Sequence, residues 1–405
     1  MSGGNGCPHA PREGFLNATR YTVGMAAAVL MGLGAGTLVA WAYLLLFHSH
    51  FWRIRRVLPS ACDEPAEGKI VAVIPARNEA ESIAASISSL LQQRGAKLVR
   101  IFLVDDGSTD GTAERARESA ERAGAADRLT VIRGEALPPG WTGKVWAMQQ
   151  GIASALELNP EFLLLTDADV SHSLTNVTDL VTLAQRGNYD LVSLMVKLHC
   201  ESIPEKLLIP AFVFFFFKLY PPRWVSDPKS RTAGAAGGCM LIRPEALKRA
   251  GGMEAIRGEI IDDCALAKAV KRTGGRVWLG LAPETRSLRR YSSFAEIGRV
   301  ISRTAFNQLE HSVLLLLLAV FGLCFLYLLP VGLAFSGTRA TAALGGTSWL
   351  LMALAYLPMV RFYGINPVWA VSLPLAALFY MGATLHSALN YWRGRGGEWK
   401  GRIQD

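Results

Sequence analysis

Residues 99–112 read VRIFLVDDGSTDGT, an apolar run that ends in acids, glycines and hydroxyl-bearing side chains. A short apolar run bounded by turn residues is typical of a buried strand. The next residues, AERARESAERAG (113–124), have a helix-like composition and close on a glycine, a frequent helix end. This order of strand, polar loop and helix predicts a layered α/β fold.

The same order continues on both sides of this stretch. We expect further strands and helices at 69–75, 81–93, 128–134, 144–156 and 161–169. The strands are apolar without strong alternation, which indicates a mostly parallel central sheet covered on both faces. Ligands of such sheets bind beyond the carboxyl ends of the strands. Polar clusters fall at three of these ends, at 77–79, 105–110 and 167–169.

The remaining apolar residues gather in four segments. The chain is 51% hydrophobic with a mean hydropathy of +0.24, which is high for a soluble enzyme. Each segment is near the ~20 residues that cross a bilayer as a helix, and none contains Asp, Glu, Lys or Arg. The segments are 23–47, 313–335, 340–360 and 367–385.

These segments divide the chain into domains. We expect a disordered start, an anchor, a linker, a soluble domain, a membrane region of about three helices and a basic tail. Their predicted bounds are 1–20, 21–50, 51–68, 69–305, 306–390 and 391–405.

Positive residues predict the orientation of the anchor. Arg53, Arg55 and Arg56 follow the first segment, and positive charge beside a span marks the cytoplasmic side. The soluble domain should therefore be cytoplasmic. Three further crossings would place the tail outside, yet NYWRGRGGEWKGR (390–402) is basic. Either a late segment does not cross fully or the charge rule fails at this end.

The charge distribution disfavours nucleic acid as a partner, and the cysteine spacing disfavours metal–thiolate and disulfide sites. Much of the net charge of +9 flanks apolar segments, which favours anionic lipid head groups over nucleic acid. The six cysteines are scattered without a Cys-x-x-Cys pair. Metal–thiolate sites and disulfide frameworks are therefore not expected, in keeping with a reducing cytosol.

The stretch LLLTDADVSH (163–172) places two acids two residues apart after a buried strand. In a strand Asp167 and Asp169 would face the same way, and two carboxylates repel unless positive charge lies between them. A solvated turn is the alternative. His172 could join Asp169 on a metal, but a single histidine is more often an ordinary hydrogen-bonding residue.

The loop DDGSTDG (105–111) resembles the start of a calcium loop, but Arg117 occupies the position of the required bidentate glutamate. Its side chains either cap the following helix or accept hydrogen bonds from a uracil-like base or a ribose. Lys144 stands at a helix start after two glycines, where it suits a diphosphate or is simply solvated.

Paired acids open the helix in GEIIDDCALAKAVKRTGG (258–275). They either complement the helix dipole or supply a general base near an acceptor hydroxyl. The stretch 289–309 is basic and aromatic and leads into the second apolar segment, as an interfacial helix would. The apolar, proline-broken stretch 207–224 suits core, an acceptor groove or a membrane-dipping segment.

Taken in order, these motifs resemble those of inverting family 2 glycosyltransferases over about 70–309. PARNE (75–79) resembles the first nucleotide-binding strand end, VDDGSTDGT the acidic uridine-binding turn, and GKVWAMQQG the Gly-Lys-x-x-Ala-x-x-x-Gly helix. DAD resembles the Asp-x-Asp metal motif, and GGCMLIRPEAL (237–247) the glycine-rich acceptor-side segment. IDDCALA resembles Glu-Asp-x-x-Leu, with Asp262 in place of the glutamate and Asp263 at the position of the base.

The family's Gln-x-x-Arg-Trp motif is only partly kept. Arg303 matches its arginine, whereas Val300 and Thr304 replace the glutamine and the tryptophan, which disfavours a processive polysaccharide synthase. The layout of anchor, catalytic domain and C-terminal spans is similar to that of ceramide glucosyltransferases. It is most similar to the hopene-associated glycosyltransferases of bacterial hopanoid clusters.

The resemblance implies a GT-A fold and a role for each matching residue. The implied catalytic residues are Asp263, Asp262 and Arg303, and the implied ligands of Mg²⁺ or Mn²⁺ are Asp169 and Asp167. The implied nucleotide-sugar-binding residues are Pro75, Ala76, Arg77, Glu79, Asp105, Asp106, Lys144, Asp167, Gly237 and Gly238.

The implied activity is transfer from a nucleotide sugar, expected to be a UDP-sugar, to a lipid hydroxyl, with a hopanoid as the suggested acceptor. The implied location is the bacterial inner (plasma) membrane. Alternatives are transfer to polyprenyl phosphate, polysaccharide synthesis and a non-catalytic scaffold that binds nucleotide sugars. A transporter is disfavoured because no apolar segment carries an Asp, Glu, Lys or Arg.

Overall fold

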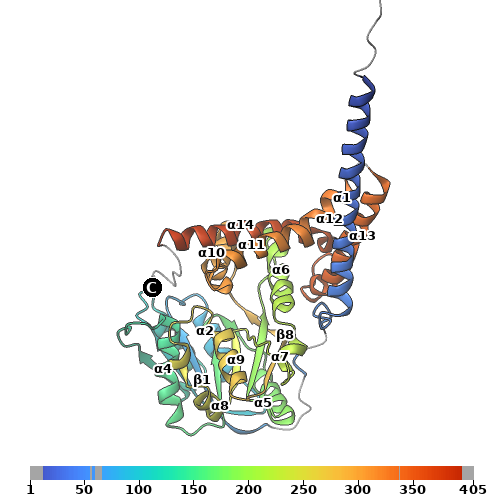
Figure 1. Ribbon diagram of the computed structural model, residues 1–405. Coiled ribbons are helices and arrows are strands. Elements are labelled where there is room, and N and C mark those ends of the chain that lie inside the picture. The colour runs from blue at the N-terminus through green and yellow to red at the C-terminus, as the bar shows by residue number, and fades with distance from the viewer. Residues whose placement is uncertain (1–11, 55–56, 60–65, 337, 395–405) are drawn as a thin grey trace, which may run out of the picture.

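The computed structural model describes residues 12–54, 57–59, 66–336 and 338–394. Figure 1 shows an α/β domain beneath a layer of long helices, with helix α1 rising away from both. The strands are β1 (Ala66–Ala76), β2 (Ala96–Asp105), β3 (Leu129–Arg133), β4 (Phe162–Thr166), β5 (Val170–Ser171), β6 (Leu191–Lys197), β7 (Cys239–Ile242) and β8 (Val277–Ser287).

The eight strands form one sheet in the order β3-β2-β1-β4-β7-β6-β8-β5. Strands β1 to β4, the four predicted from the sequence, pair in parallel, as do β6 and β8. Strand β7 runs antiparallel to β4 and β6, and β5 runs antiparallel to β8. The predicted mostly parallel sheet is confirmed, and β7 reverses direction at its centre.

Helices cover both faces of the sheet. Along β1, Ile70, Ala72 and Ile74 belong to one buried cluster, together with residues of α2 (Ile83–Leu91) and α5 (Asn176–Gly187). Val71 and Val73 belong to the opposite cluster, which contains residues of α4 (Gly143–Leu156). Alternate side chains of a strand point to opposite faces, so both faces of β1 are core.

Gly151 lets α4 approach the sheet closely. A Cβ atom at this position would lie 2.5 Å from Cγ1 of Val73 and 2.9 Å from Cγ2 of Val104. Contacts this short are strongly repulsive in a close-packed core. The second glycine of the GKVWAMQQG motif therefore positions the helix that begins next to Lys144.

The remaining helices of the α/β domain are short. They are α3 (Thr112–Arg122), η1 (Ala126–Arg128), α7 (Pro222–Ser226), α8 (Pro244–Arg249), η2 (Met253–Ile256) and α9 (Asp262–Arg272). The longer α6 (Ile203–Leu219) stands between the sheet and the helical layer (Figure 1). A capping box begins α6, in which Ser202 and Glu205 each accept a hydrogen bond from the other's backbone N–H.

The helical layer contains the four predicted apolar segments. Its elements are α1 (Arg12–Leu46), α10 (Phe294–Thr304), η3 (Asn307–Leu309), α11 (Val313–Leu323), the π-helical η4 (Cys324–Leu328), α12 (Leu329–Ala334), α13 (Arg339–Phe362), η5 (Pro367–Ser372) and α14 (Leu373–Trp392). Four stretches are long and apolar enough to cross a membrane: Gly24–Leu46, Val313–Ala334, Arg339–Phe362 and Pro367–Trp392.

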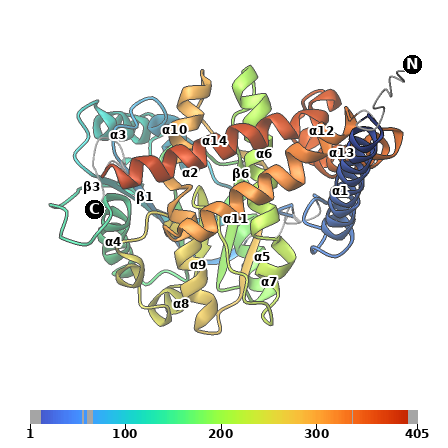
Figure 2. The ribbon, with the colours of Figure 1, turned by 45° about the horizontal axis from the view of Figure 1, so that its top comes forward.

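These helices do not all run in one direction. Figures 1 and 2 show α13 standing beside α1, whereas α11 and α14 lie across the α/β domain. Side chains link α1 to α13, since the hydroxyl oxygens of Thr37 and Ser348 lie 3.2 Å apart. If α1 crosses a bilayer along its normal, α11 and α14 lie along the bilayer surface.

The start of the chain differs from the prediction. Helix α1 begins at Arg12, whereas disorder was predicted through residue 20. No proline occurs between Pro11 and Pro59, and extending an existing helix is far easier than nucleating one. Arg55, Arg56, residues 1–11 of the predicted disordered start (1–20) and residues 395–405 of the predicted basic tail (391–405) lie outside the described residues.

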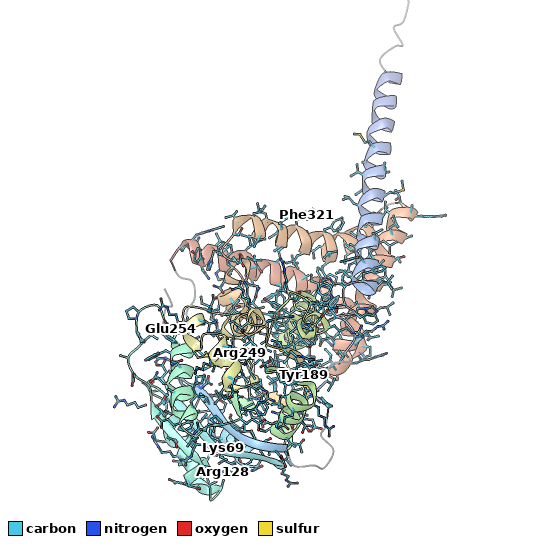
Figure 3. The ribbon with its side chains drawn as sticks, turned by 60° about the horizontal axis from the view of Figure 1, so that its bottom comes forward. Lys69, Arg128, Tyr189, Arg249, Glu254 and Phe321 are labelled. Carbon is cyan, nitrogen blue, oxygen red and sulfur yellow. The ribbon has the colours of Figure 1, made fainter. Side chains whose placement is uncertain are left out.

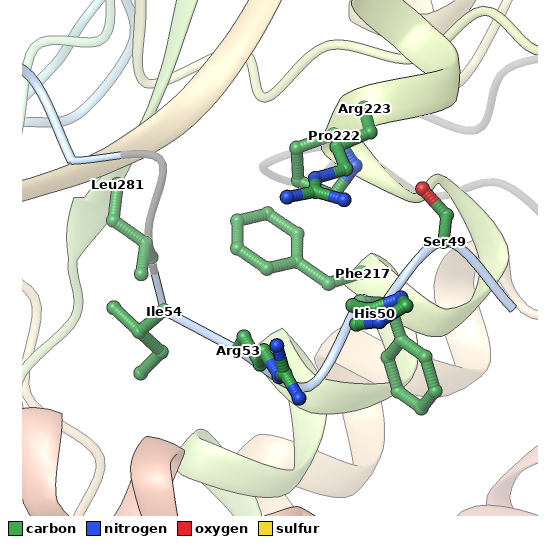
Figure 4. Close-up of a pocket in the computed structure, with 9 residues that line it drawn as sticks. Ser49, His50, Arg53, Ile54, Phe217, Pro222, Arg223 and Leu281 are labelled. Atoms are coloured by element: carbon green, nitrogen blue, oxygen red, sulfur yellow. The ribbon is translucent and has the colours of Figure 1, made fainter. Parts of the chain in front are cut away.

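The segment after α1 packs onto the α/β domain. Figure 4 shows a small pocket where Ser49, His50, Arg53 and Ile54 meet Phe217, Pro222, Arg223 and Leu281. The N–H of Leu58 donates to the carbonyl of Leu281 at 3.0 Å. The predicted linker is therefore partly fixed against α6, α7 and β8.

Candidate functional site

A cavity of about 830 Å³ lies between the sheet and the helical layer. Figure 3 places Phe321 of α11 at the opposite end of the molecule from Lys69, at the start of β1, and Arg128, just before β3. The carboxyl ends of the parallel strands therefore face the apolar helices. Of the residues predicted to act, the cavity is lined by Pro75, Glu79, Lys144, Asp167, Asp169, Gly237, Gly238, Asp262, Asp263 and Arg303.

Sheet register explains why loops from distant parts of the sequence meet here. Thr166, the last residue of β4, pairs with Cys239, the first residue of β7. The hydroxyl of Thr166 donates to the carbonyl of Gly238 at 2.8 Å, and the N–H of Asp167 donates to the same oxygen at 3.3 Å. The DAD loop and the glycine pair are thus joined directly.

Lys144 is the positive centre of the site. Its Nζ atom lies 3.0 Å from Oδ1 of Asp167 and 3.4 Å from Oδ2 of Asp262. Burial alone would lower the pKa of Lys144, but the negative charges of Asp167, Asp262 and Asp263 raise it well above its ordinary value. The lysine therefore stays charged, at the N-terminus of α4, where an anionic group is favoured.

Asp263 has the environment of a general base. Its Oδ2 accepts a hydrogen bond from the N–H of Gly237, and its Oδ1 accepts one from the N–H of Cys264, both at 2.7 Å. Burial, followed by the negative charge of Asp262, raises the pKa of Asp263 to about 7. A base with a pKa near the working pH transfers protons most effectively.

Gly237 lies close to both Asp263 and Lys144. A Cβ atom at this position would lie 3.3 Å from Oδ2 of Asp263 and 3.3 Å from Nζ of Lys144. A side chain here would crowd both charged groups. A glycine at this position therefore leaves both charged groups undisturbed.

Asp167 and Asp169 fit a divalent cation. Burial, and then the negative charges of Asp167 and Glu79, raise the pKa of Asp169 to about 6. These like charges repel one another, and a cation between them would offset that repulsion. In the described part of the chain, no group of three or more His, Cys, Asp or Glu side chains is arranged to hold a metal. A cation would therefore need further ligands, such as phosphate oxygens.

His172 has the ordinary role that the sequence favoured. Its Nε2 lies 3.1 Å from the hydroxyl of Thr166, and its Nδ1 lies 3.0 Å from the amide nitrogen of Asn176. Burial lowers the pKa of His172 to about 3, so the ring is neutral. Both ring nitrogens are engaged away from Asp169.

The other predicted nucleotide-binding residues, Ala76, Arg77, Asp105 and Asp106, are not among those that line the cavity. Ala76 and Asp105 are register partners at the ends of β1 and β2. The guanidinium of Arg77 donates to the carbonyl of Asp106 and lies 3.6 Å from its carboxylate.

The turn after β2 is held by its own side chains. Oδ1 of Asp105 accepts a hydrogen bond from the N–H of Ser108 at 3.0 Å. Asp110 accepts from the N–H groups of Ala80 and Thr112, at 3.0 and 3.1 Å, which holds the start of α3. The capping role that the sequence left open therefore exists, at Asp110.

Helix α10 forms one wall of the cavity. Ile297 and Ile301 are buried in the core, and Arg299, Val300, Ser302 and Arg303 line the cavity. Burial and the neighbouring charge of Arg289 lower the pKa of Arg303, while Asp262 and Asp167 act in the opposite direction. The stretch predicted as an interfacial helix thus brings Arg303 to the acids.

The apolar stretch 207–224 serves two purposes. Leu208, Phe214 and Phe217 of α6 are buried in the core, whereas Phe212 and Phe216 line the cavity. Two of the three interpretations of this stretch, core and groove, therefore apply to α6.

The sequence did not predict several residues of the cavity. Ser287 ends β8 and Arg289 follows it, and the Ser287 hydroxyl donates to Oδ2 of Asp169 at 3.3 Å. His386 and Asn390 of α14 also line the cavity. Two polar residues four apart in an apolar helix were a usable signal, but the predicted span ended at residue 385.

The α/β domain is similar to known proteins. Residues 71–251 match the family model described as glycosyl transferase family 2. The chain is also similar to a mannosyltransferase from Pyrobaculum calidifontis solved in complex with GDP-Man and Mn²⁺, at 18% identity and a TM-score of 0.49, covering 86% of this chain and 99% of that one.

A second similar structure is the glucosyl-3-phosphoglycerate synthase of Mycobacterium tuberculosis, solved with Mn²⁺, UDP-glucose and phosphoglyceric acid. It shares 20% identity at a TM-score of 0.37, covering 57% of this chain and 76% of that one. The match runs from within β1 to beyond β7, so this part of the chain is similar to a family 2 glycosyltransferase domain of the GT-A fold. Asp262, Asp263 and Arg303 follow the matched stretch.

Proposed function

We propose that the chain is a membrane-bound inverting glycosyltransferase that moves a sugar from a nucleotide sugar, expected to be a UDP-sugar, to a lipid hydroxyl. One observation carries this proposal. A single cavity joins Lys144 and the carboxylates of Asp167, Asp169 and Asp263 to the aromatic wall of α6. A nucleotide sugar suits the charged end, and a lipid suits the apolar end.

The chain's own groups support a single displacement. Asp263 accepts the proton of the acceptor hydroxyl, whose oxygen attacks the anomeric carbon from the face opposite the leaving diphosphate. Lys144 and Arg303 stabilise the negative charge that develops on the diphosphate. Asp167 and Asp169 would hold Mg²⁺ or Mn²⁺, which neutralises charge on a departing diphosphate when bound. Glu79, at the end of β1, adds negative charge beside them.

The turn after β2 completes the proposed donor site. Asp105 and Asp106 stand at the carboxyl end of β2, and Ala76 and Arg77 at that of β1. We propose that these residues bind the nucleobase and the ribose, because a nucleotide whose diphosphate lies at Lys144 extends along the strand ends.

The helical layer supports the proposed acceptor class and location. Four apolar stretches support a multi-pass protein of the bacterial inner membrane, with the α/β domain in the cytoplasm. Within the lipid class we propose a hopanoid, on the similarity of layout to the hopene-associated glycosyltransferases. Polyprenyl phosphate is the main alternative, since its phosphate is already ionised and needs no base.

A lipid-extract assay tests the proposal. The purified full chain in nanodiscs of its host's lipids receives a panel of radiolabelled nucleotide sugars with Mn²⁺ or Mg²⁺. We expect label in a small lipid, lost in Asp169→Asn and Asp263→Asn. Transfer that survives in Asp263→Asn indicates a phosphate acceptor. No transfer from any donor, with nucleotide sugar still bound, contradicts the proposal and favours a scaffold.

A further inference from the structure

The C-terminal helix α14 presents two polar side chains to the active-site cavity. His386 and Asn390 both line this cavity, together with Lys144 and Asp263 at its charged end. Residues four apart lie on the same face of a helix, so the two side chains act on one region of space. Most of the rest of α14 is apolar, and its leucines Leu385 and Leu389 are exposed, as is His386 itself.

Neither polar side chain is used by the fold. Among the described residues, no hydrogen bond is formed by the imidazole of His386 or by the side-chain amide of Asn390. Their neighbour Ser387 differs, because its hydroxyl accepts a hydrogen bond from the N–H of Phe306 at 3.0 Å and so ties α14 to the end of α10. His386 and Asn390 thus keep their full capacity to bind a ligand in the cavity.

Part of the cavity wall is apolar. Phe212 and Phe216 of α6 and Val300 of α10 line the same cavity, and Phe212 and Val300 remain 37% and 41% exposed. Figure 2 shows α14 and α11 lying over α6 and α10, so the apolar wall adjoins the helical layer. A ligand that meets both surfaces must carry a polar end on an apolar body.

We propose that His386 and Asn390 form an acceptor-positioning subsite. They hydrogen-bond the polar end of a neutral lipid alcohol while its apolar body lies against Phe212 and Phe216, and its hydroxyl is thereby directed to Asp263. This inference rests on the proposed lipid acceptor. It adds that the acceptor enters between α6, α10 and α14. It also assigns selectivity for the acceptor to α14, whose composition alone indicates only a membrane span.

Photolabelling tests the subsite without requiring turnover. The full chain in nanodiscs of phosphatidylethanolamine and phosphatidylglycerol is labelled with a long-chain alcohol that carries a diazirine next to its hydroxyl, and adducts are mapped by mass spectrometry. We expect adducts on the cavity face of α6 and α14, reduced at least threefold in the double variant His386→Ala/Asn390→Ala. Leu378→Ala, at an exposed position of α14 that does not line the cavity, is the control and should label as the parent chain does.

Kinetics separate positioning from chemistry and from donor binding. Loss of one neutral hydrogen bond predicts that His386→Ala or Asn390→Ala raises the acceptor KM about three- to tenfold, with kcat and donor affinity nearly unchanged. His386→Gln, which keeps a donor and an acceptor, should restore most of the loss. A hydroxylated hopanoid and a polyprenyl phosphate serve as the two acceptor probes.

The outcomes distinguish this inference from the proposed function. Adducts confined to residues of α14 that do not line the cavity, or equal labelling of the double variant and Leu378→Ala, overturn the subsite. Transfer to lipid with an unchanged acceptor KM in both alanine variants also overturns it and leaves the proposed function standing. Cavity-face adducts that depend on His386 and Asn390, without sugar transfer to either probe, support the subsite and contradict the proposed acceptors.

Discussion

The Oδ2 atom of Asp263 accepts a hydrogen bond from the N–H of Gly237 at 2.7 Å. This bond fixes the carboxylate against the segment that leads into β7, while Lys144, which also lies close to Gly237, pairs with Asp167 and Asp262. The backbone of Gly237 and the charged Lys144 therefore set the position of the proposed base relative to the proposed diphosphate site.

Replacing the proposed base tests the chemistry. Asp263→Asn keeps the shape of the side chain but cannot take a proton, so kcat should fall by about 10²- to 10⁴-fold. Donor binding, measured by calorimetry with the nucleotide sugar and Mn²⁺, should change little. A variant that keeps more than a tenth of the parent kcat with a lipid alcohol would rule out this role for Asp263.

The pH dependence of kcat/KM follows from the pKa of Asp263. This carboxylate must be ionised to act, and its pKa is raised to about 7 by burial and by Asp262. Activity should therefore rise as the pH rises through about 7 and level off above it. In Asp262→Asn the neighbouring negative charge is gone, so the rise should move to lower pH. A rise that stays in place or moves upward contradicts this assignment.

Adding one methyl group at Gly237 should disturb the site more than the fold. The new Cβ would lie 3.3 Å from both Oδ2 of Asp263 and Nζ of Lys144, a separation at which the neighbours must give way. We expect Gly237→Ala to lower kcat/KM at least tenfold with little change in thermal unfolding. Gly346→Ala is the control, because its Cβ would meet nothing within 4 Å. Equal activity of the two variants would contradict the role of Gly237.

The crosswise helices predict the side of the basic tail. With α11 and α14 along the bilayer surface, the chain returns to the side of the α/β domain, as the positive charge of residues 390–402 favours. In a chain whose own cysteines are replaced by serine, Gly394→Cys should react with an impermeant maleimide in inverted membrane vesicles but not in intact spheroplasts. The reverse pattern would show that α14 crosses.

Parts of the fold could be predicted because each strand carries its own signal. The apolar runs before Pro75, Asp105 and Asp167 can each be recognised from their own residues, and each leads into a polar loop. Strand β7 is only four residues long, and its pairing with β4 and β6 is a long-range contact that no local pattern encodes. The pattern of apolar residues therefore predicted the first half of the sheet better than the second.

The site shows the same division. The acids and Lys144 were visible as motifs, whereas the pairing of Arg77 with Asp106 depends on how two loops meet. His386 and Asn390 come from a helix whose composition predicts membrane, and only its packing over α6 and α10 brings them to the cavity. Residues that reach a site through tertiary packing carry little signal in the sequence around them.

The stereochemistry of transfer tests the central claim most directly. The product formed from an α-linked nucleotide sugar and a lipid alcohol is isolated, and its anomeric proton coupling is measured by NMR. A single displacement assisted by Asp263 predicts a β-linked product and no sugar bound to the protein. An α-linked product, or a sugar covalently attached to the chain, would contradict the account.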